Sequence, residues 1–291
     1  MILVWGTPKD PPVAAVLSAL TRTGREAFLL DQDDKGDFAF EPGVCGRSGS
    51  ILSTGVGTID LAEVTAAYIR PFATAGSPVE RELSAELLGW CDVASACIVN
   101  RPEAMASNNS KPYQAALIHA SGFAVPKTIV TNDSGALAAF AERHGPLIYK
   151  SASGVRSIVA RYDPRDGSRL GDLATCPTQF QQWIAGTDVR VHVVGDEVFA
   201  CEVRSTAIDY RYPDNEAERP RLTACTLPVG IAQRCRELAA ALGLAFAGID
   251  LRRTDQGEWV CFEVNPSPAF TYYEDATGLP IAAALAELLA G

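Results

Sequence analysis

The stretch that decides the fold is FAGIDLRRTDQGEWVCFEVNPSP, residues 246–268. Two apolar runs flank the turn sequence TDQG, a pattern that predicts a β-hairpin. A turn centred on the Asp–Gln bond of TDQG would place Asp250 opposite Cys261, and side-chain alternation would give Glu263 and Asn265 the same face. The other face would be apolar and would carry Ile249, Leu251, Val260, Phe262 and Val264.

The polar face of this hairpin has the chemistry of a divalent-cation site. Two carboxylates and an amide oxygen are hard oxygen ligands with little basic compensation expected nearby, which predicts Mg²⁺ bound together with phosphate. The alternative is that they are solvent-facing positions of an antiparallel sheet. A register slip of one residue would separate the three side chains. Pro266 and Pro268 end the strand directly after Asn265 and turn the chain.

Composition limits the classes of protein to consider. The 291 residues are 47% hydrophobic, enough for a sizeable core in two or three lobes. The apolar runs are short, and Met1 is followed by ILVWG without a basic region and cleavage site, so we expect a cytoplasmic protein with no membrane partner. A formal net charge of −10 argues against nucleic acid as a partner. The eight cysteines form no C-x-x-C pair, which favours reduced core thiols; Cys91 and Cys97 are the closest pair.

The chain begins with a β-α-β pattern, with ILVWG and EAFLLD as strands and PPVAAVLSALTRTG as the helix between them. The polar segment RPEAMASNNSK reads as a connection, which places the end of a first lobe near residue 100. The remaining residues alternate short helices and strands. We therefore predict a multidomain fold of the α/β and α+β classes.

The segments SNNSKPYQAALIHASGFAVPKTIVTN, PLIYKSASG, QFQQWIAGTDVRVHVVGDEVFACEVRS and the hairpin resemble, in this order, ATP-grasp ligases of the RimK-like group. Within the group, STAIDYR, LPVGI and EDATGLPIAAALAELL look most like the graspetide (microviridin-like) maturases, which install ω-ester or ω-amide cross-links in ribosomal peptides. The resemblance implies an ATP-grasp fold with a pre-ATP-grasp β-α-β domain at residues 1–100, a central or lid subdomain at 101–183, and a C-terminal subdomain with the Mg²⁺-binding hairpin at 184–291.

The resemblance also implies roles for matching residues. Asp250, Glu263 and Asn265 would hold two Mg²⁺ ions, with Glu263 as the bridge. Lys111 and Lys150 would grip the nucleotide phosphates, which suits the compact charge of an ammonium group.

Further matches concern adenine and the transferred phosphoryl group. The hinge expected to bind adenine through its backbone consists of Gln181, Gln182, Trp183 and Ile184. Arg190 and Arg204 would face the γ-phosphate and the developing acyl phosphate. Many relatives have a glutamate where Gln182 stands, and the phosphate-covering loop SASGVRS has a single glycine.

Four residues are candidates for the substrate side of the site. Asp209 and Arg211 match a D-x-R pair near the acceptor site, with loop solubility as the alternative. Arg70 resembles an arginine in the maturases that would contact substrate. Tyr272 would line the acceptor pocket or pack against the last helix.

The histidines carry no catalytic pattern. His119, His144 and His192 form neither a metal-ligand spacing nor a nucleophile–base pair, which favours structural or surface roles. A G-x-S-x-G motif and a Rossmann glycine fingerprint are both missing from the sequence.

The function that follows is an ADP-forming carboxylate–amine or carboxylate–hydroxyl ligase that works through an acyl phosphate. Its cofactors would be ATP and two Mg²⁺ ions, with Mn²⁺ as a substitute. Its partners would be a carboxylate and an acceptor, either on a precursor peptide or as free amino acids or small dipeptides, and a homodimer is the default assembly. The alternatives are a phosphotransferase and a non-catalytic ATP-binding regulator.

Overall fold

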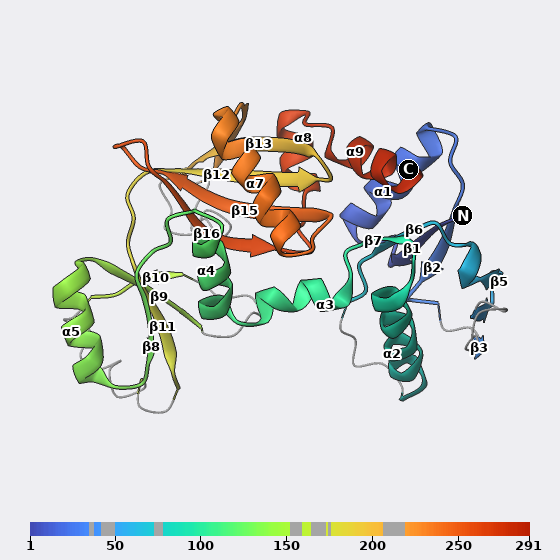
Figure 1. Ribbon diagram of the computed structural model, residues 1–291, viewed down its shortest axis with the longest axis horizontal. Coiled ribbons are helices and arrows are strands. Elements are labelled where there is room, and N and C mark those ends of the chain that lie inside the picture. Colours follow the sequence, from blue (N-terminus) through green and yellow to red (C-terminus); the bar gives the residue numbers. More distant parts are fainter. Residues whose placement is uncertain are drawn as a thin grey trace.

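The computed structural model describes residues 1–34, 38–41, 50–72, 78–151, 159–163, 173, 176–205 and 219–291. Within them the strands form three larger sheets and one small sheet (Figure 1). One larger sheet is parallel, and the other two are antiparallel. This combination confirms the predicted α/β and α+β classes. No helix in the described part of the chain is long and apolar enough to span a bilayer.

The N-terminal part confirms the expected β-α-β start, because its first two strands pair in parallel across an intervening helix. Its parallel sheet has the order β2-β1-β6-β7, and a three-stranded antiparallel sheet lies beyond β2 in the chain. The elements are β1 (Ile2–Gly6), α1 (Pro11–Arg22), β2 (Ala27–Asp31), β3 (Ala39–Glu41), β4 (Ile51–Thr54), β5 (Gly57–Asp60), η1 (Leu61–Glu63), β6 (Ala66–Ile69), α2 (Pro78–Val93) and β7 (Cys97–Val99).

The middle of the chain forms a second, antiparallel sheet of order β10-β9-β11-β8, covered by α5. Leu137 of α5 packs with Leu147 and Phe180 of this sheet in a separate small core. The elements are α3 (Pro102–Met105), η2 (Ala106–Asn109), α4 (Lys111–Ala120), β8 (Thr128–Thr131), α5 (Ser134–His144), β9 (Leu147–Ser151), β10 (Ala160–Arg161) and β11 (Thr178–Gln182).

The C-terminal part forms a five-stranded antiparallel sheet of order β14-β13-β12-β15-β16. Helix α7 packs on one face of this sheet, and α9 packs on the other. The elements are β12 (Thr187–Val194), β13 (Glu197–Arg204), β14 (Arg221–Cys225), α7 (Val229–Ala241), β15 (Phe246–Arg253), β16 (Trp259–Asn265), α8 (Thr271–Thr277) and α9 (Ile281–Ala290).

The N-terminal and C-terminal sheets share one hydrophobic core. Val4 and Leu20 of the N-terminal part pack in the same buried cluster as Phe246, Phe270 and Leu285, and α1 lies against α9 (Figure 1). The first lobe therefore does not bury helix α1 alone.

Helix α4 packs with the C-terminal sheet, although the sequence groups it with the central segment 101–183. Ile118 and Phe123 are buried in the cluster that contains Val191 and Ile249 of the C-terminal sheet. Figure 1 shows α4 directly below β16. The domain limits predicted from the sequence stay a prediction.

The edge strand β16 is covered along its open side by residues from the preceding segment. The Gln114 side chain of α4 donates to the Val264 carbonyl (2.8 Å) and accepts from the Val264 N–H (3.0 Å). The Cys261 N–H donates to the Ala124 carbonyl at 2.9 Å. Both positions thus find partners outside the sheet.

The register predicted for the hairpin is wrong, yet the face of its acidic residues is preserved. Thr254 and Glu258 close a three-residue loop whose Gly257 has a positive φ of 83°, so the turn is one residue longer than predicted. Leu251 pairs with Cys261, and Asp250 pairs with Glu263 instead of Cys261.

A β-bulge then shifts the register by one further residue and returns Glu263 to the face of Asp250. The register shifts between Asp250 and Leu251, which leaves Phe262 as the extra residue on β16. Because the longer turn pairs Cys261 with Leu251, Cys261 and not Phe262 lies in the apolar core. Phe262 is half-buried with the Arg252 guanidinium 5.1 Å from its ring centroid. Without the bulge, Glu263 would point to the opposite face.

The thiols agree with the expectation of reduced cysteines. Cys91 and Cys97 are both free, and burial raises the pKa of Cys91 to about 12. The other buried thiols are Cys201, Cys235 and Cys261, whereas Cys176 is exposed and Cys225 is half-buried.

Candidate active site

Three oxygen-bearing side chains converge on one face of the β15–β16 hairpin. Asp250 stands opposite Glu263, and Asn265 stands opposite Gly248 two residues along. The Asp250 and Glu263 side chains retain 35% and 23% exposure. Two carboxylates and an amide oxygen, partly open to solvent, match the ligand preference of Mg²⁺. The donor set therefore fits the predicted ion.

Each carboxylate lies beside a cation, contrary to the expectation of little basic compensation. Arg190 Nη1 lies 2.7 Å from Asp250 Oδ1, and Lys111 Nζ lies 3.8 Å from Glu263 Oε2. Lys111 is the first residue of α4, and Arg190 stands beside Asp250 on the neighbouring strand β12. These cations offset the repulsion between two carboxylates placed directly across the strands. Both cations are distant from the hairpin in the sequence, so the hairpin sequence alone does not predict them.

Arg190 lies in a space that only a glycine can provide. A Cβ on Gly248 would stand 2.1 Å from Arg190 Nη2 and 2.6 Å from Pro268 Cβ. The guanidinium also lies 5.6 Å from the ring centroid of Tyr273. The sequence reading passed over Gly248, although a glycine inside a strand signals close approach of another group.

His192 lies on the same face as Arg190 and is fully buried. Its Nε2 accepts from Arg190 Nε at 3.4 Å, and its Nδ1 has no partner among the described residues. Burial and the nearby Arg190 charge hold the pKa of His192 well below its usual range. The ring is therefore neutral, and it packs against Phe246 and Tyr273.

Lys150 lies on β9 in a polar face shared with β11. It is buried at 7% exposure and pairs in register with Gln179, which precedes Gln181 on the same face. The side-chain oxygens of both glutamines are buried and have no hydrogen-bond partner in the described structure. Buried acceptors without partners are costly, so these oxygens fit a ligand that brings hydrogen-bond donors. Apart from Ser151, the loop SASGVRS lies outside the described residues.

The hinge after β11 is fixed by hydrogen bonds to the chain on both sides. The Gln182 and Trp183 N–H groups donate to Lys127 and Pro146 carbonyls, each at 2.8 Å. The Ile184 carbonyl accepts from Arg252 Nη1 at 2.6 Å.

Arg252 of β15 organises this hinge and was not singled out in the sequence. It binds Asp188 through Nε at 2.7 Å and through Nη2 at 2.9 Å. Its guanidinium lies 5.1 Å from the Trp183 ring centroid, and Arg161 lies 4.6 Å from that ring. Trp183 thus lies against two guanidinium groups instead of presenting only apolar surface.

Other predicted site residues lie apart from this group. Arg204 is 74% exposed in its side chain and pairs with Glu202 at 2.6 Å; it alternates along β13 with Cys201, the register partner of Arg190, and so starts from the opposite face. Tyr272 is half exposed, whereas its neighbour Tyr273 is buried. Asp209 and Arg211 lie outside the described residues.

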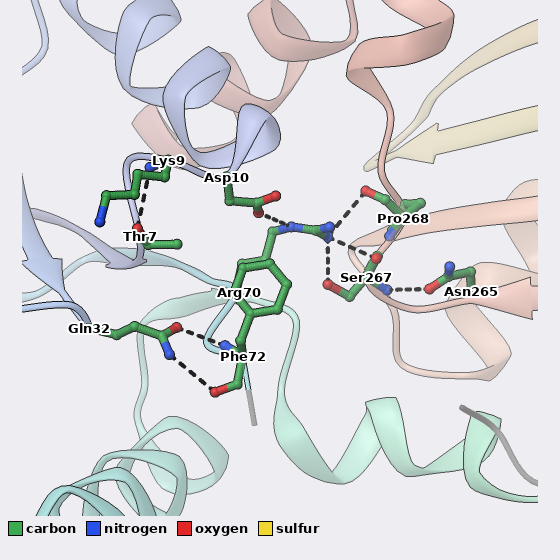
Figure 2. A network of polar contacts seen from close by, with 9 residues as sticks. All are labelled: Thr7, Lys9, Asp10, Gln32, Arg70, Phe72, Asn265, Ser267 and Pro268. Atoms are coloured by element: carbon green, nitrogen blue, oxygen red, sulfur yellow. Dashed lines mark hydrogen bonds and ion pairs between the residues drawn. The ribbon is translucent and has the colours of Figure 1, made fainter. Parts of the chain in front are cut away.

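Arg70 joins the N-terminal sheet to the loop that follows Asn265 (Figure 2). Its Nε donates to Asp10, and its Nη1 donates to the Ser267 carbonyl and hydroxyl oxygens, both at 2.8 Å. Its side chain is 11% exposed. The predicted substrate contact of Arg70 stays a prediction, but its donors are directed to the protein itself.

The chain matches the sequence pattern of a known protein family. Residues 107–289 match the RimK-like ATP-grasp domain, which covers more than half of the sequence. The chain belongs to this family, as the resemblance predicted, and its fold is the ATP-grasp fold.

Relatives extend the comparison. The chain is 28% identical to human N-acetylaspartylglutamate synthase A over 202 residues, which are 65% of this chain and 51% of that protein. It thus spans about half the length of this curated relative. It is 24% identical to the tetrahydromethanopterin:alpha-L-glutamate ligase of Methanosarcina acetivorans, over 97% of this chain and 96% of that protein. Among solved structures, the ATP-grasp ligase PsnB in complex with minimal precursor, Mg and ADP superposes with a TM-score of 0.82 at 27% identity, covering 99% of this chain and 96% of PsnB.

Proposed function

We propose that the protein is an ADP-forming, Mg²⁺-dependent ligase that joins a carboxylate to an amine or hydroxyl. The observation that carries this proposal is the convergence of Asp250, Glu263 and Asn265 beside Arg190 and Lys111. Acids that could hold a cation and cations that could hold phosphate meet on one face. That combination suits phosphoryl transfer from ATP.

The reaction would proceed in two balanced steps. The substrate carboxylate attacks the γ-phosphorus of ATP, the bond to the β–γ bridging oxygen breaks, and acyl phosphate and ADP form. The acceptor then attacks the acyl carbon, phosphate leaves with the carbon–oxygen bond electrons, and the acceptor loses a proton. Bound Mg²⁺ would supply charge neutralisation of the phosphate oxygens.

The chain's own residues would bind and orient the reactants. Lys111 and Lys150 would hold phosphate oxygens, and Arg190 would turn from Asp250 toward the transferred phosphoryl group as the acid takes up its ion. The hinge at 181–184 would present its backbone to adenine. To reach the same phosphate, Arg204 would need to leave both Glu202 and the opposite face of the sheet.

For the substrate, we favour a precursor peptide. PsnB, which is similar over nearly its whole length, was solved with a minimal precursor. N-acetylaspartylglutamate synthase A and the tetrahydromethanopterin:alpha-L-glutamate ligase match this chain at similar identity. Addition of a free amino acid to a small acid is therefore the second candidate. Two Mg²⁺ ions, Mn²⁺ as substitute, a homodimer and a cytoplasmic location complete the proposal.

The test is incubation of the full chain with ATP, Mg²⁺ and either candidate precursor peptides or pooled amino acids. ADP and product masses are followed by mass spectrometry. A peptide mass lower by one water supports cross-linking, and a joined pair of small molecules supports the second candidate. A stable phosphorylated product without condensation would indicate a phosphotransferase, and ATP binding without ADP formation would indicate a regulator.

The first prediction concerns the bridging acid of the proposed site. Glu263→Gln should lower ADP formation about a hundredfold or more, since a neutral amide holds a divalent cation poorly. Its melting temperature should change little, because relief of the repulsion with Asp250 offsets the loss of the ion pair with Lys111. The matched control is Glu258→Gln in the turn of the same hairpin, where the side chain is exposed. Unchanged ADP formation by Glu263→Gln would refute the assignment.

A further inference from the structure

Helix α1 is preceded by an acidic residue that bonds outside the helix. Asp10 occupies the N-cap position, yet its side chain makes no cap hydrogen bond to its own helix. An aspartate at this position ordinarily accepts from the N–H of the second or third helical residue. The second helical residue is Pro12, which has no N–H, so Val13 alone could supply this bond. Here the carboxylate, 8% exposed, instead accepts from Arg70 Nε. With few capping donors in its own helix, the Asp10 carboxylate instead binds Arg70 (Figure 2).

The loop that Arg70 reaches has few donors of its own. Proline at 266 and at 268 removes two N–H groups, and the Ser267 N–H donates to Asn265 Oδ1 at 2.9 Å. The loop is therefore held through its carbonyl oxygens. Arg70 Nη1 donates to the Ser267 carbonyl at 2.8 Å and to the Pro268 carbonyl at 3.3 Å.

Asn100, directly after β7, takes the remaining carbonyl. Its Nδ2 donates at 2.6 Å to Pro266 and at 2.6 Å to Phe246, and its Oδ1 accepts from the Phe246 N–H at 3.0 Å. The carbonyls of residues 266–268 thus all bind side chains of the N-terminal part. The two side chains come from the ends of adjacent parallel strands, β6 and β7.

We propose that the Arg70–Asp10 pair positions the side chain of Asn265 for the metal. Arg70 fixes Ser267, Ser267 fixes the Asn265 oxygen, and Asp10 fixes the guanidinium. Arg70 is a positioning residue that touches neither metal nor substrate. This inference rests on the proposed function, since it assigns Asn265 to the Mg²⁺ site.

The experiment measures Mg²⁺ binding, not turnover. Mg²⁺ is titrated by calorimetry into the full chain saturated with a non-hydrolysable ATP analogue. Arg70→Gln should raise the half-saturating Mg²⁺ concentration about tenfold, the size of effect seen when support of a metal ligand is lost. Arg70→Lys keeps the charge beside Asp10 but loses the fork, so its shift should be smaller. Asp10→Asn should shift in the same direction.

The matched control is Arg101→Gln. Arg101 donates to four backbone carbonyls within the N-terminal part, those of Cys91, Asp92, Ala94 and Ala96. Its loss should lower the melting temperature without changing Mg²⁺ binding. The inference fails if Arg70→Gln binds Mg²⁺ as the wild type does, or if Arg101→Gln shifts it equally.

Failure of the proposed function would look different. In that case the wild type would bind no Mg²⁺ with the nucleotide analogue, or Glu263→Gln would bind it normally. If Arg70→Gln does not fold, Arg70→Lys and Asp10→Asn carry the test. A change in substrate half-saturation alone, with Mg²⁺ binding intact, would return Arg70 to its predicted substrate role and overturn the positioning role.

Discussion

At Gly248 the absence of a side chain decides where the guanidinium of Arg190 can lie. The strand residue passes so close to Arg190 and Pro268 that a single methyl group would overlap both. Arg190 in turn binds Asp250 and the neutral ring of His192. Because Gly248 has no Cβ, Arg190 can contact both Asp250 of the proposed metal site and His192, which packs against buried aromatic residues.

The second prediction is that Gly248→Ala displaces Arg190. Overpacking of this kind costs about 1–3 kcal/mol of stability. We expect ADP formation to fall at least about tenfold, because a displaced Arg190 could not reach the transferred phosphoryl group. Denaturant unfolding and ADP assays check both expectations. The control is Gly230→Ala in α7, where an added Cβ meets no atom within 4 Å. A Gly248→Ala variant with the stability and the ADP formation of the wild type would contradict the packing argument.

Among elements, the β15–β16 hairpin joins a left-handed turn to a compensating bulge. Sequence reasoning found the two strands and the acidic face, since both follow from alternation. It missed the register because TDQG allows loops of two or three residues, and it missed the bulge because no residue type announces one at Phe262. The longer turn and the bulge each shift the register by one residue, so together they leave Asp250 and Glu263 on the same face.

The third prediction concerns the turn. Gly257 has φ of 83° and no neighbour that a Cβ would touch, so a substitution there acts through the backbone alone. Gly257→Ala should lower the free energy of unfolding by about 1 kcal/mol. Gly257→Asn should cost less, because asparagine tolerates the left-handed region. Urea denaturation of both variants is the measurement, and equal stabilities of Ala, Asn and wild type would contradict the argument.

At the scale of the whole molecule, the N-terminal sheet is not an independent lobe. Its helix α1 packs on α9, and the buried cluster runs from Val4 to Leu285. The sequence predicted the order of elements well, because each short motif carries its own periodicity. It did not predict the contacts of Arg70 and Asn100 with the loop at 266–268, because such contacts join residues more than a hundred positions apart. The resemblance to the family predicted the roles of Lys111 and Glu263, but only the folded structure shows that the two side chains lie close together.

The fourth prediction tests this shared core. Leu285→Ala should cost about 2–5 kcal/mol and should reduce hydrogen-exchange protection in β1 as well as in α9. The matched control is Leu137→Ala, which is equally buried but lies in the separate core of the central sheet. It should expose β9 and β11 while β1 stays protected. Protection lost only locally in α9 after Leu285→Ala would argue against a common core.

The side chain of Gln114 has a consequence for how this sheet meets other chains. By bonding both backbone groups of Val264, it stands in for one residue of a missing strand, and Ala124 does the same for the Cys261 N–H. An exposed edge strand invites an extended peptide to add itself by main-chain pairing. At β16 these positions are already taken from within the molecule. β-Augmentation is therefore blocked there, and a peptide arriving at this edge must be recognised by its side chains.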